Sequence, residues 1–197
     1  MSRRELGGER RSSRGLRGIQ GPRYRHVDES ERGEVAMAAR VQISMEPKEL
    51  TKALASFPEQ IVGIVAGHDE ARLTWRPDAK TWSVSDVLAH LRSCAEMQGK
   101  WIAAMLDRDN PTLRAVSPRS AFRKYVDRDF AVSLKEFAEE RAALVERLRA
   151  LDGADWGRKL TFTGASPRSS NPTVTHCAWA LGQHELDHLP QLRELLT

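Results

Sequence analysis

Apolar residues recur at alternating steps of three and four positions in four separate segments of the chain, and this spacing constrains the fold more than any other feature. Such spacing places the apolar side chains on one face of a helix. The first segment runs from Leu50 to Ile64 and contains Pro58, with Ser56 and Glu59 placed as a capping box. We therefore expect a short lead-in that gives way to the main helix at the proline.

The other three segments carry start and stop signals of their own. The second helix is expected over about 83–107, with a serine cap at its start. The third should begin at the capping box that opens with Ser133 and should end before Gly153. The fourth should open with Asn171 as N-cap and Pro172 at the first helical position.

Four helices of this kind predict an all-α fold, a four-helix bundle over residues 46–197. The linkers, about 69–82, 107–132 and 152–171, are longer than the turns of an up-and-down bundle, so we expect at least one crossover connection. Only residues 159–163 alternate like a strand, and that stretch is too short to predict one.

Residues 1–40 differ in composition from the rest of the chain. They hold ten arginines against six acidic residues, so the remaining 157 residues carry 21 basic and 21 acidic side chains, and the net charge of +4 belongs to the first segment. Rich in Arg and Gly and poor in apolar residues, this segment is expected to be a disordered tail, with Met37 as a later start. The alternative is an arm that binds nucleic acid.

Hydrophobic runs and cysteines exclude further classes of protein. No apolar run approaches the roughly 18 residues that a membrane-spanning helix needs. Two cysteines cannot form a disulfide framework, which favours a reducing compartment and hence a cytoplasmic protein. Cys94 and Cys177 fall on inward helix faces, where we expect small buried hydrophobic residues. The alternative makes Cys94 a fourth metal ligand.

Four polar side chains interrupt the apolar helix faces: His90, Arg141, His184 and His188. A polar group that faces a bundle core is costly unless it finds a partner. His184 and His188 are four residues apart, so they project from the same face of the last helix. Three imidazoles from two helices could hold zinc or a similar divalent ion, and hydrogen-bonded core histidines are the alternative.

The last helix also contains the sequence HELDH at 184–188, which matches the HExxH pattern of zinc proteases. In that pattern the glutamate, here Glu185, is the general base. The extended protease motif needs a glycine and a third histidine further along, where this chain has Gln191 and Glu194. A protease is therefore not favoured, and a third ligand has to come from upstream, which points to His90.

Arg141 is a formal charge on the inward face of the third helix. Because a guanidinium does not lose its proton, Arg141 must reach an end of the bundle or meet a carboxylate. We expect Glu96 as its partner and Asp129 as the second choice. The functional alternative is that Arg141 binds a carboxylate of the substrate.

Two stretches resemble the DinB superfamily. The sequence TWSVSDVLAHL at 81–91 resembles the entry to the second helix of that family, and HELDHLPQL at 184–192 resembles its closing helix. Phe137 and Arg141 match a phenylalanine and an arginine four residues apart in its third helix. The resemblance covers about residues 50–197.

This resemblance implies a four-helix bundle with a divalent metal ion held by His90, His184 and His188. We expect this ion to be zinc or nickel. Characterised members of the family include transferases of bacillithiol, mycothiol or glutathione. We therefore expect a metal-dependent enzyme that transfers a low-molecular-weight thiol to an electrophilic small molecule. Asp187 and Gln191 are expected beside the ligands.

Other functions stay open. One is a hydrolase that uses a metal hydroxide with Glu185 as its base, and another is a non-catalytic bundle that binds a metal or a ligand. Pro190 departs from the family pattern and predicts a kink just after His188. The expected partners are small molecules, with no membrane and no specific nucleic acid, and a homodimer is left open.

Overall fold

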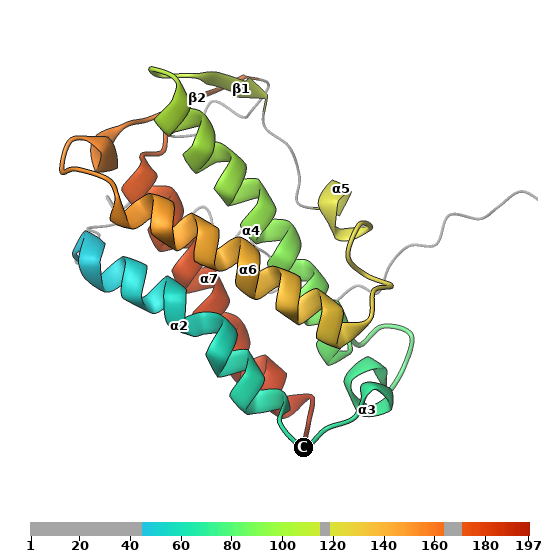
Figure 1. Cartoon of the computed structure of the whole chain (residues 1–197). Coiled ribbons are helices and arrows are strands. Elements are labelled where there is room, and N and C mark those ends of the chain that lie inside the picture. The colour runs from blue at the N-terminus through green and yellow to red at the C-terminus, as the bar shows by residue number, and fades with distance from the viewer. Residues whose placement is uncertain (1–44, 115–118, 164–170) are drawn as a thin grey trace, which may run out of the picture.

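The computed structural model describes residues 45–114, 119–163 and 171–197. The Arg- and Gly-rich segment 1–40, with the later start at Met37, lies outside the described residues. The described residues form a four-helix bundle, which confirms the predicted fold class (Figure 1). Its long helices are α2 (Pro47–Val65), α4 (Val84–Asp107), α6 (Phe130–Arg149) and α7 (Val174–Glu194).

Short elements occupy the connections. They are α3 (Glu70–Thr74) before α4, β1 (Thr112–Arg114) and α5 (Arg119–Phe122) between α4 and α6, and the 3-10 turn η1 (Asp155–Gly157) and β2 (Thr161–Thr163) before α7. The two strands pair in parallel, with Thr112 opposite Thr161. The sequence did not predict β1, because three residues are too few to show the alternation of a strand.

The helix directions explain the long connections. In Figure 1, α2 and α7 run one way along the bundle, while α4 and α6 run the other way. Helix α2 packs against α6 and α7, and α4 packs against the same two helices. Since α4 and α6 follow each other in the chain and run in the same direction, the segment between them must travel back along the bundle. The predicted crossover connection is therefore confirmed.

Helix α4 starts where its capping residues predict. The Ser83 hydroxyl accepts a hydrogen bond from the backbone N–H of Asp86 at 3.1 Å, and the Asp86 carboxylate accepts one from the backbone N–H of Ser83 at 2.8 Å. This reciprocal arrangement satisfies two of the backbone donors that a helix leaves open at its start.

Helix α2 continues through Pro58, so the expected break at this residue was wrong. The helix begins at Pro47, with Glu46 as its N-cap. The Ser56 hydroxyl donates to the carbonyl oxygen of Ala53 at 3.0 Å and so does not cap a new helix. A proline removes one backbone hydrogen bond from a helix, and burial of the apolar face of α2 outweighs that loss.

The starts of α6 and α7 differ by a few residues from the prediction. Helix α6 begins at Phe130, and its N-cap, Asp129, lies four residues before the predicted cap at Ser133. Phe130 is only 2% exposed, and its burial favours the additional turn of helix. In α7 the cap is Thr173 rather than Asn171, and the helix remains continuous through Pro190.

The apolar core is divided into two clusters along the bundle. One cluster, near the β1–β2 end, includes Leu50, Leu54, Ile102, Met105, Val145, Leu148 and Leu181. The other, near α3, includes Phe57, Ile61, Val87, Leu91, Phe137, Leu189 and Leu192. In α6 and α7, Arg141 and Glu185 occupy the positions between the two clusters. A polar layer therefore crosses the middle of the bundle.

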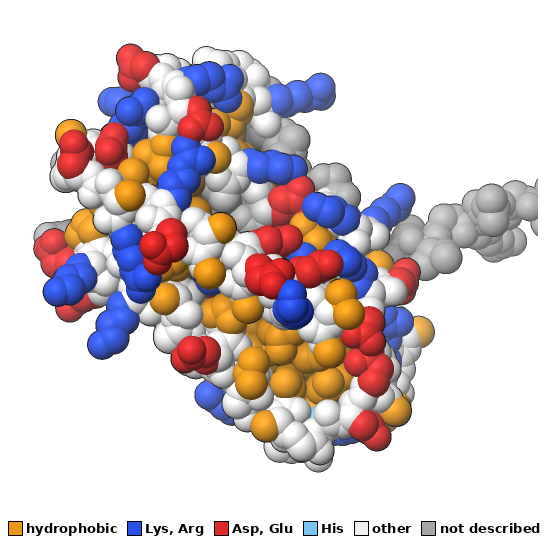
Figure 2. Space-filling view, in the orientation of Figure 1, with side chains coloured by type: hydrophobic (Ala, Val, Ile, Leu, Met, Phe, Trp, Pro, Cys, Tyr) orange, Lys and Arg blue, Asp and Glu red, His pale blue; other side chains and the backbone are white. Residues whose placement is uncertain are grey.

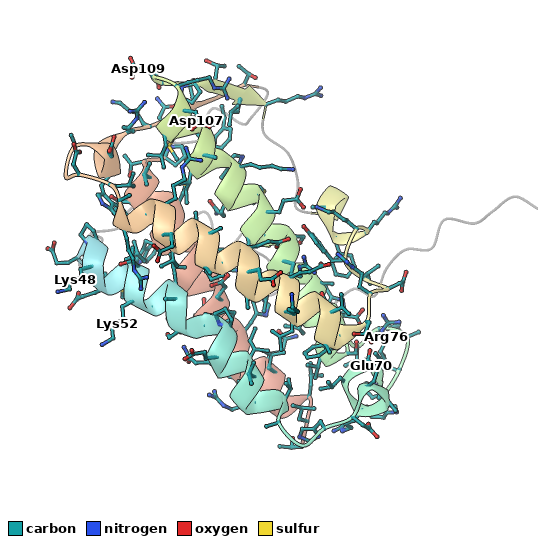
Figure 3. All side chains as sticks on the ribbon, in the orientation of Figure 1. Lys48, Lys52, Glu70, Arg76, Asp107 and Asp109 are labelled. Carbon is teal, nitrogen blue, oxygen red and sulfur yellow. The ribbon has the colours of Figure 1, made fainter. Side chains whose placement is uncertain are left out.

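Figure 3 labels two charged residues, Glu70 and Arg76, at the end of the bundle where α3 lies. The Glu70 carboxylate accepts a hydrogen bond from the backbone N–H of Phe130 at 3.2 Å. The Arg76 guanidinium donates to both carboxylate oxygens of Asp86 at 2.5 Å. These contacts attach the connection between α2 and α4 to the first turns of α4 and α6.

Charged side chains of both signs are mixed over the face in Figure 2, and hydrophobic side chains gather towards one end of it. This mixture agrees with the charge balance of residues 41–197. None of the described helices is long and apolar enough to span a membrane.

Arg92 is a buried charge that the sequence analysis missed. Its side chain is 1% exposed, and its guanidinium donates to Ser133 Oγ at 3.1 Å, to Glu136 at 2.9 Å and to Glu140 at 2.9 Å. The guanidinium carbon also lies 4.3 Å from the centre of the Tyr125 ring. Arg92 thus joins α4 to α6 and to the crossover segment.

We predict that Arg92→Ala lowers the free energy of unfolding by about 2–3 kcal/mol, because it removes charge-assisted hydrogen bonds from a buried position. Urea denaturation followed by circular dichroism measures this change. The control is Arg149→Ala, whose exposed pair with Glu146 should contribute less than about 1 kcal/mol. Equal losses in the two variants would contradict the prediction.

Candidate metal centre

Helices α4 and α7 bring His90, His184 and His188 together in the middle of the bundle. The Nε2 atom of His184 lies 3.1 Å from Nε2 of His90 and 3.3 Å from Nε2 of His188. The ring centroids are separated by 4.7 to 5.1 Å in edge-to-face arrangements. Among the described residues, these form the one group of three or more potential ligands whose donor atoms all lie within 4.8 Å of one another. Their role as ligands stays a prediction.

The separations between the ring nitrogens fit a divalent ion. Zinc–nitrogen bonds of about 2.0–2.1 Å, at angles between about 90° and 109°, place the nitrogens about 2.8–3.4 Å apart. The distances of 3.1 and 3.3 Å fall within that range. Imidazole nitrogen is a ligand that suits zinc, nickel, copper and iron, so the donor set does not choose among these ions.

Gln191 contacts the outer nitrogen of one candidate ligand. Its Oε1 atom lies 2.6 Å from Nδ1 of His188. If Nδ1 carries the proton and donates it to this oxygen, the lone pair of Nε2 is directed at the other two histidines. Gln191 therefore lies where a residue that orients His188 would be expected.

Asp187 does not reach the histidines. Its side chain is exposed and accepts a hydrogen bond from Gln183 Nε2 at 2.9 Å. Successive residues of a helix are about 100° apart, which places Asp187 on a different face from its neighbour His188. The sequence-predicted position of Asp187 beside the ligands is therefore not observed.

Arg141 pairs with Glu185, and the expectation of Glu96 or Asp129 as its partner was wrong. The side chains of Arg141 and Glu185 are 2% and 0% exposed. One guanidinium nitrogen, NH1, donates to Glu185 Oε2 at 2.8 Å, and NH2 donates to Oε1. Glu96 instead accepts from the Tyr125 hydroxyl at 2.7 Å, and Asp129 caps α6. Because Glu185 accepts from both terminal nitrogens of the guanidinium, Arg141 is not open to a substrate carboxylate.

The same pair changes the meaning of the HExxH pattern. Burial raises the pKa of the Glu185 carboxyl to about 7, and the positive charge of Arg141 opposes this rise. Both carboxylate oxygens face Arg141 rather than the solvent. In this arrangement Glu185 is a structural partner of α6, and the pattern provides two histidines without a free base.

Two aromatic side chains extend from the histidine cluster. The Trp82 ring lies 5.2 Å from the His90 ring, and the Phe122 ring stacks on Trp82 at 5.9 Å with an angle of 15° between the planes. Neither residue was predicted from the sequence to belong to the site. Trp82 belongs to the stretch that resembles the DinB superfamily, whereas Phe122 lies in a linker with no recognisable motif.

Both cysteines are buried, as expected, and neither forms a disulfide. Burial raises the pKa of the Cys177 thiol to about 12. The Sγ atom of Cys94 lies 3.8 Å from Nε2 of His90, but it does not belong to the group of donor atoms that all lie within 4.8 Å of one another. A role for Cys94 as fourth ligand is therefore not favoured.

We predict that alanine in place of His90, His184 or His188 abolishes stoichiometric binding of Zn²⁺, because two imidazoles are too few to hold the ion against water. Isothermal titration calorimetry and elemental analysis of the purified protein measure the loss. The matched control is His176→Ala, which replaces a half-buried histidine of α7, the helix that carries His184 and His188. This variant should keep its full metal content. Unchanged binding in all four variants would exclude the site.

A second prediction concerns Gln191. Replacement by alanine should weaken metal binding by about 10- to 100-fold, the usual effect of removing a partner that orients a ligand. Gln191→Glu restores an acceptor for the Nδ1 proton of His188 and should recover most of the affinity. Competition with a chelator of known affinity gives both values. An alanine variant as tight as the unmodified protein would show that Gln191 does not orient His188.

Comparison with known proteins gives a family and a structural relative. The model of the DinB superfamily matches residues 50–192. The structure is similar to that of YfiT from Bacillus subtilis, described as a probable metal-dependent hydrolase with an unusual four-helix bundle topology. The TM-score is 0.66 at 16% sequence identity, over 80% of this chain and 91% of that chain. No curated protein matches the sequence.

Proposed function

The chain belongs to the DinB superfamily, and from this premise we propose that it is a divalent-metal-dependent enzyme that transfers a low-molecular-weight thiol to an electrophilic small molecule. His90, His184 and His188 would hold the ion. The observation that carries the proposal is the convergence of their Nε2 atoms, at 3.1 and 3.3 Å. A bound divalent ion would lower the pKa of a thiol and stabilise the thiolate.

The ion pair of Glu185 with Arg141 favours a thiol over water as the nucleophile. Hydrolysis of the HExxH type uses the glutamate as the base for metal-bound water, and here that carboxylate, adjacent to His184, is bound to a guanidinium in the core. A thiol has an ordinary pKa of about 8.5 and free water one of about 15.7, and a bound divalent ion lowers both, to about 7 for water on zinc, so a thiol needs less help from the ion to lose its proton. Thiol transfer therefore needs no carboxylate base in this site.

The remaining residues of the site would keep the three imidazoles in position. Gln191 would hold the proton on Nδ1 of His188, so that Nε2 stays available. The Arg141–Glu185 pair fixes the rotation of α7 about its axis, and with it the direction of His184. The three histidines are half-buried, so part of each side chain stays accessible to a small molecule.

Metal-dependent hydrolysis is the second candidate function. It is favoured by the structural similarity to YfiT, which is described as a probable metal-dependent hydrolase. That function would depend on the lowered pKa of metal-bound water or on a base other than Glu185, because the carboxylate of Glu185 is paired with Arg141.

The test combines both reactions. Protein loaded with Zn²⁺ or Ni²⁺ is incubated with bacillithiol, mycothiol or glutathione and with chloroacetamide, and a parallel sample receives 4-nitrophenyl acetate without a thiol. In the expected reaction the thiolate sulfur forms a bond to the carbon that carries chlorine, chloride leaves with the bonding electrons, and the thiol proton passes to the solvent. We predict metal-dependent thioether formation with one of the three thiols, measured by mass spectrometry and lost in His188→Ala.

Ester hydrolysis that requires the metal but no thiol would instead establish the hydrolase. Glu185→Gln then tests whether Glu185 is the base, since it should spare thiol transfer and should abolish hydrolysis only if Glu185 takes the proton of the water. Circular dichroism must first show that this variant is folded, because the substitution alters a buried ion pair. We also propose a cytoplasmic location, where low-molecular-weight thiols stay reduced, as do Cys94 and Cys177, which form no disulfide.

A further inference from the structure

We infer that Trp82 and Phe122 form a binding surface for a planar, apolar group of the electrophilic substrate, beside the histidine cluster. The assignment of this surface to the electrophile rests on the proposed function. The existence of the surface rests on the positions of the two rings.

The rings continue the line of aromatic side chains that starts at the candidate ligands. The Trp82 ring lies 5.2 Å from the His90 ring and 5.9 Å from the Phe122 ring, and the planes of the tryptophan and the phenylalanine are nearly parallel. Both side chains are half-buried, so each keeps part of its apolar surface in contact with water. A planar group that stacks on this pair would bury that surface next to the histidines.

Each ring is held by a well-anchored segment. Trp82 directly precedes Ser83, whose side chain and backbone take part in the capping box of α4. Phe122 ends α5, and Tyr125 attaches this part of the crossover segment to α4. The Tyr125 side chain is 2% exposed, its hydroxyl donates to Glu96 at 2.7 Å, and its ring packs against the guanidinium of Arg92. The surface is therefore formed before a ligand arrives, which lowers the cost of binding.

The chemistry of the two substrates decides which of them the surface fits. Bacillithiol, mycothiol and glutathione are sugar or peptide conjugates, which expose polar groups and have no aromatic ring. Indole and phenyl faces attract planar rings, and they attract electron-poor rings most strongly because the faces carry negative charge. We therefore assign to the electrophile a planar, electron-poor group next to its reactive carbon.

The first arm of the test measures binding without reaction. Zn²⁺-loaded protein is titrated with 4-nitrobenzyl alcohol, an unreactive planar probe, and the indole N–H signals of the five tryptophans are followed by NMR, with Trp82→Phe to assign the signal. We expect the Trp82 signal to shift. We expect Phe122→Ala to raise the dissociation constant by about 3- to 10-fold, the range of one aromatic pair, and Phe122→Leu to raise it less.

Phe162→Ala is the matched control. Phe162 is also half-buried, and its ring also contacts a tryptophan, Trp101 at 4.9 Å, but it lies on β2 at the other end of the core. This variant should bind the probe as tightly as the unmodified protein. Equal effects of Phe122→Ala and Phe162→Ala, or a probe that shifts other indole signals and not that of Trp82, would overturn the inference.

The second arm measures reaction with two chlorides that share a leaving group, 4-nitrobenzyl chloride and chloroacetamide. Phe122→Ala should lower kcat/KM for the aromatic chloride about 3- to 10-fold, mainly through KM, and should lower the value for chloroacetamide much less. If neither chloride reacts but the probe still binds at Trp82, the proposed function fails and the surface stands. If both chlorides react and Phe122→Ala affects them equally, the proposed function stands and the inference about Phe122 fails.

Discussion

One buried ion pair, between Arg141 and Glu185, determines how the last helix faces the rest of the bundle. Helix α7 packs between α2 and α4, and α6 lies across the bundle from it, so the long side chain of Arg141 reaches across the core. With Glu185 directed at α6, the preceding residue points about 100° away, towards α4 and His90. The cost of removing two charges from water offsets much of their attraction. We therefore expect the pair to specify the alignment of α7 with α6 more than to raise the free energy of unfolding.

The polar layer also explains the division of the core. Apolar side chains pack above and below the level of Arg141, Glu185 and the three histidines, and no continuous apolar seam runs through α7. Sliding α7 by one turn would place a histidine or the glutamate among aliphatic side chains, at a cost of several kcal/mol for an unpaired charge. The layer therefore specifies one alignment of the helices, much as a buried polar residue specifies register in a coiled coil.

The sequence was sufficient for the helices and for the candidate ligands, because both depend on spacing along a single helix. Periodicity located the four long helices and placed His184 and His188 on one face. It could not predict the partner of Arg141, because the choice of Glu185 depends on which helices lie across the core from one another. Arg92 was missed for the same reason: it faces away from the apolar seam, and the crossover segment buries it. Helix starts differed from the prediction where tertiary packing favoured another cap. In α6, for example, the burial of Phe130 favours a start at that residue, with Asp129 as the cap.

The histidine cluster joins two parts of the chain that are distant in sequence, since His90 and His184 are 94 positions apart. An ion held by all three imidazoles would bind only when α4 and α7 are both in place, and the unfolded chain would compete weakly for it. By thermodynamic linkage, free ion at 1,000 times its dissociation constant would add about 4 kcal/mol to the free energy of unfolding. The supply of the ion in the cell would then govern how long the protein escapes degradation as well as how fast it reacts.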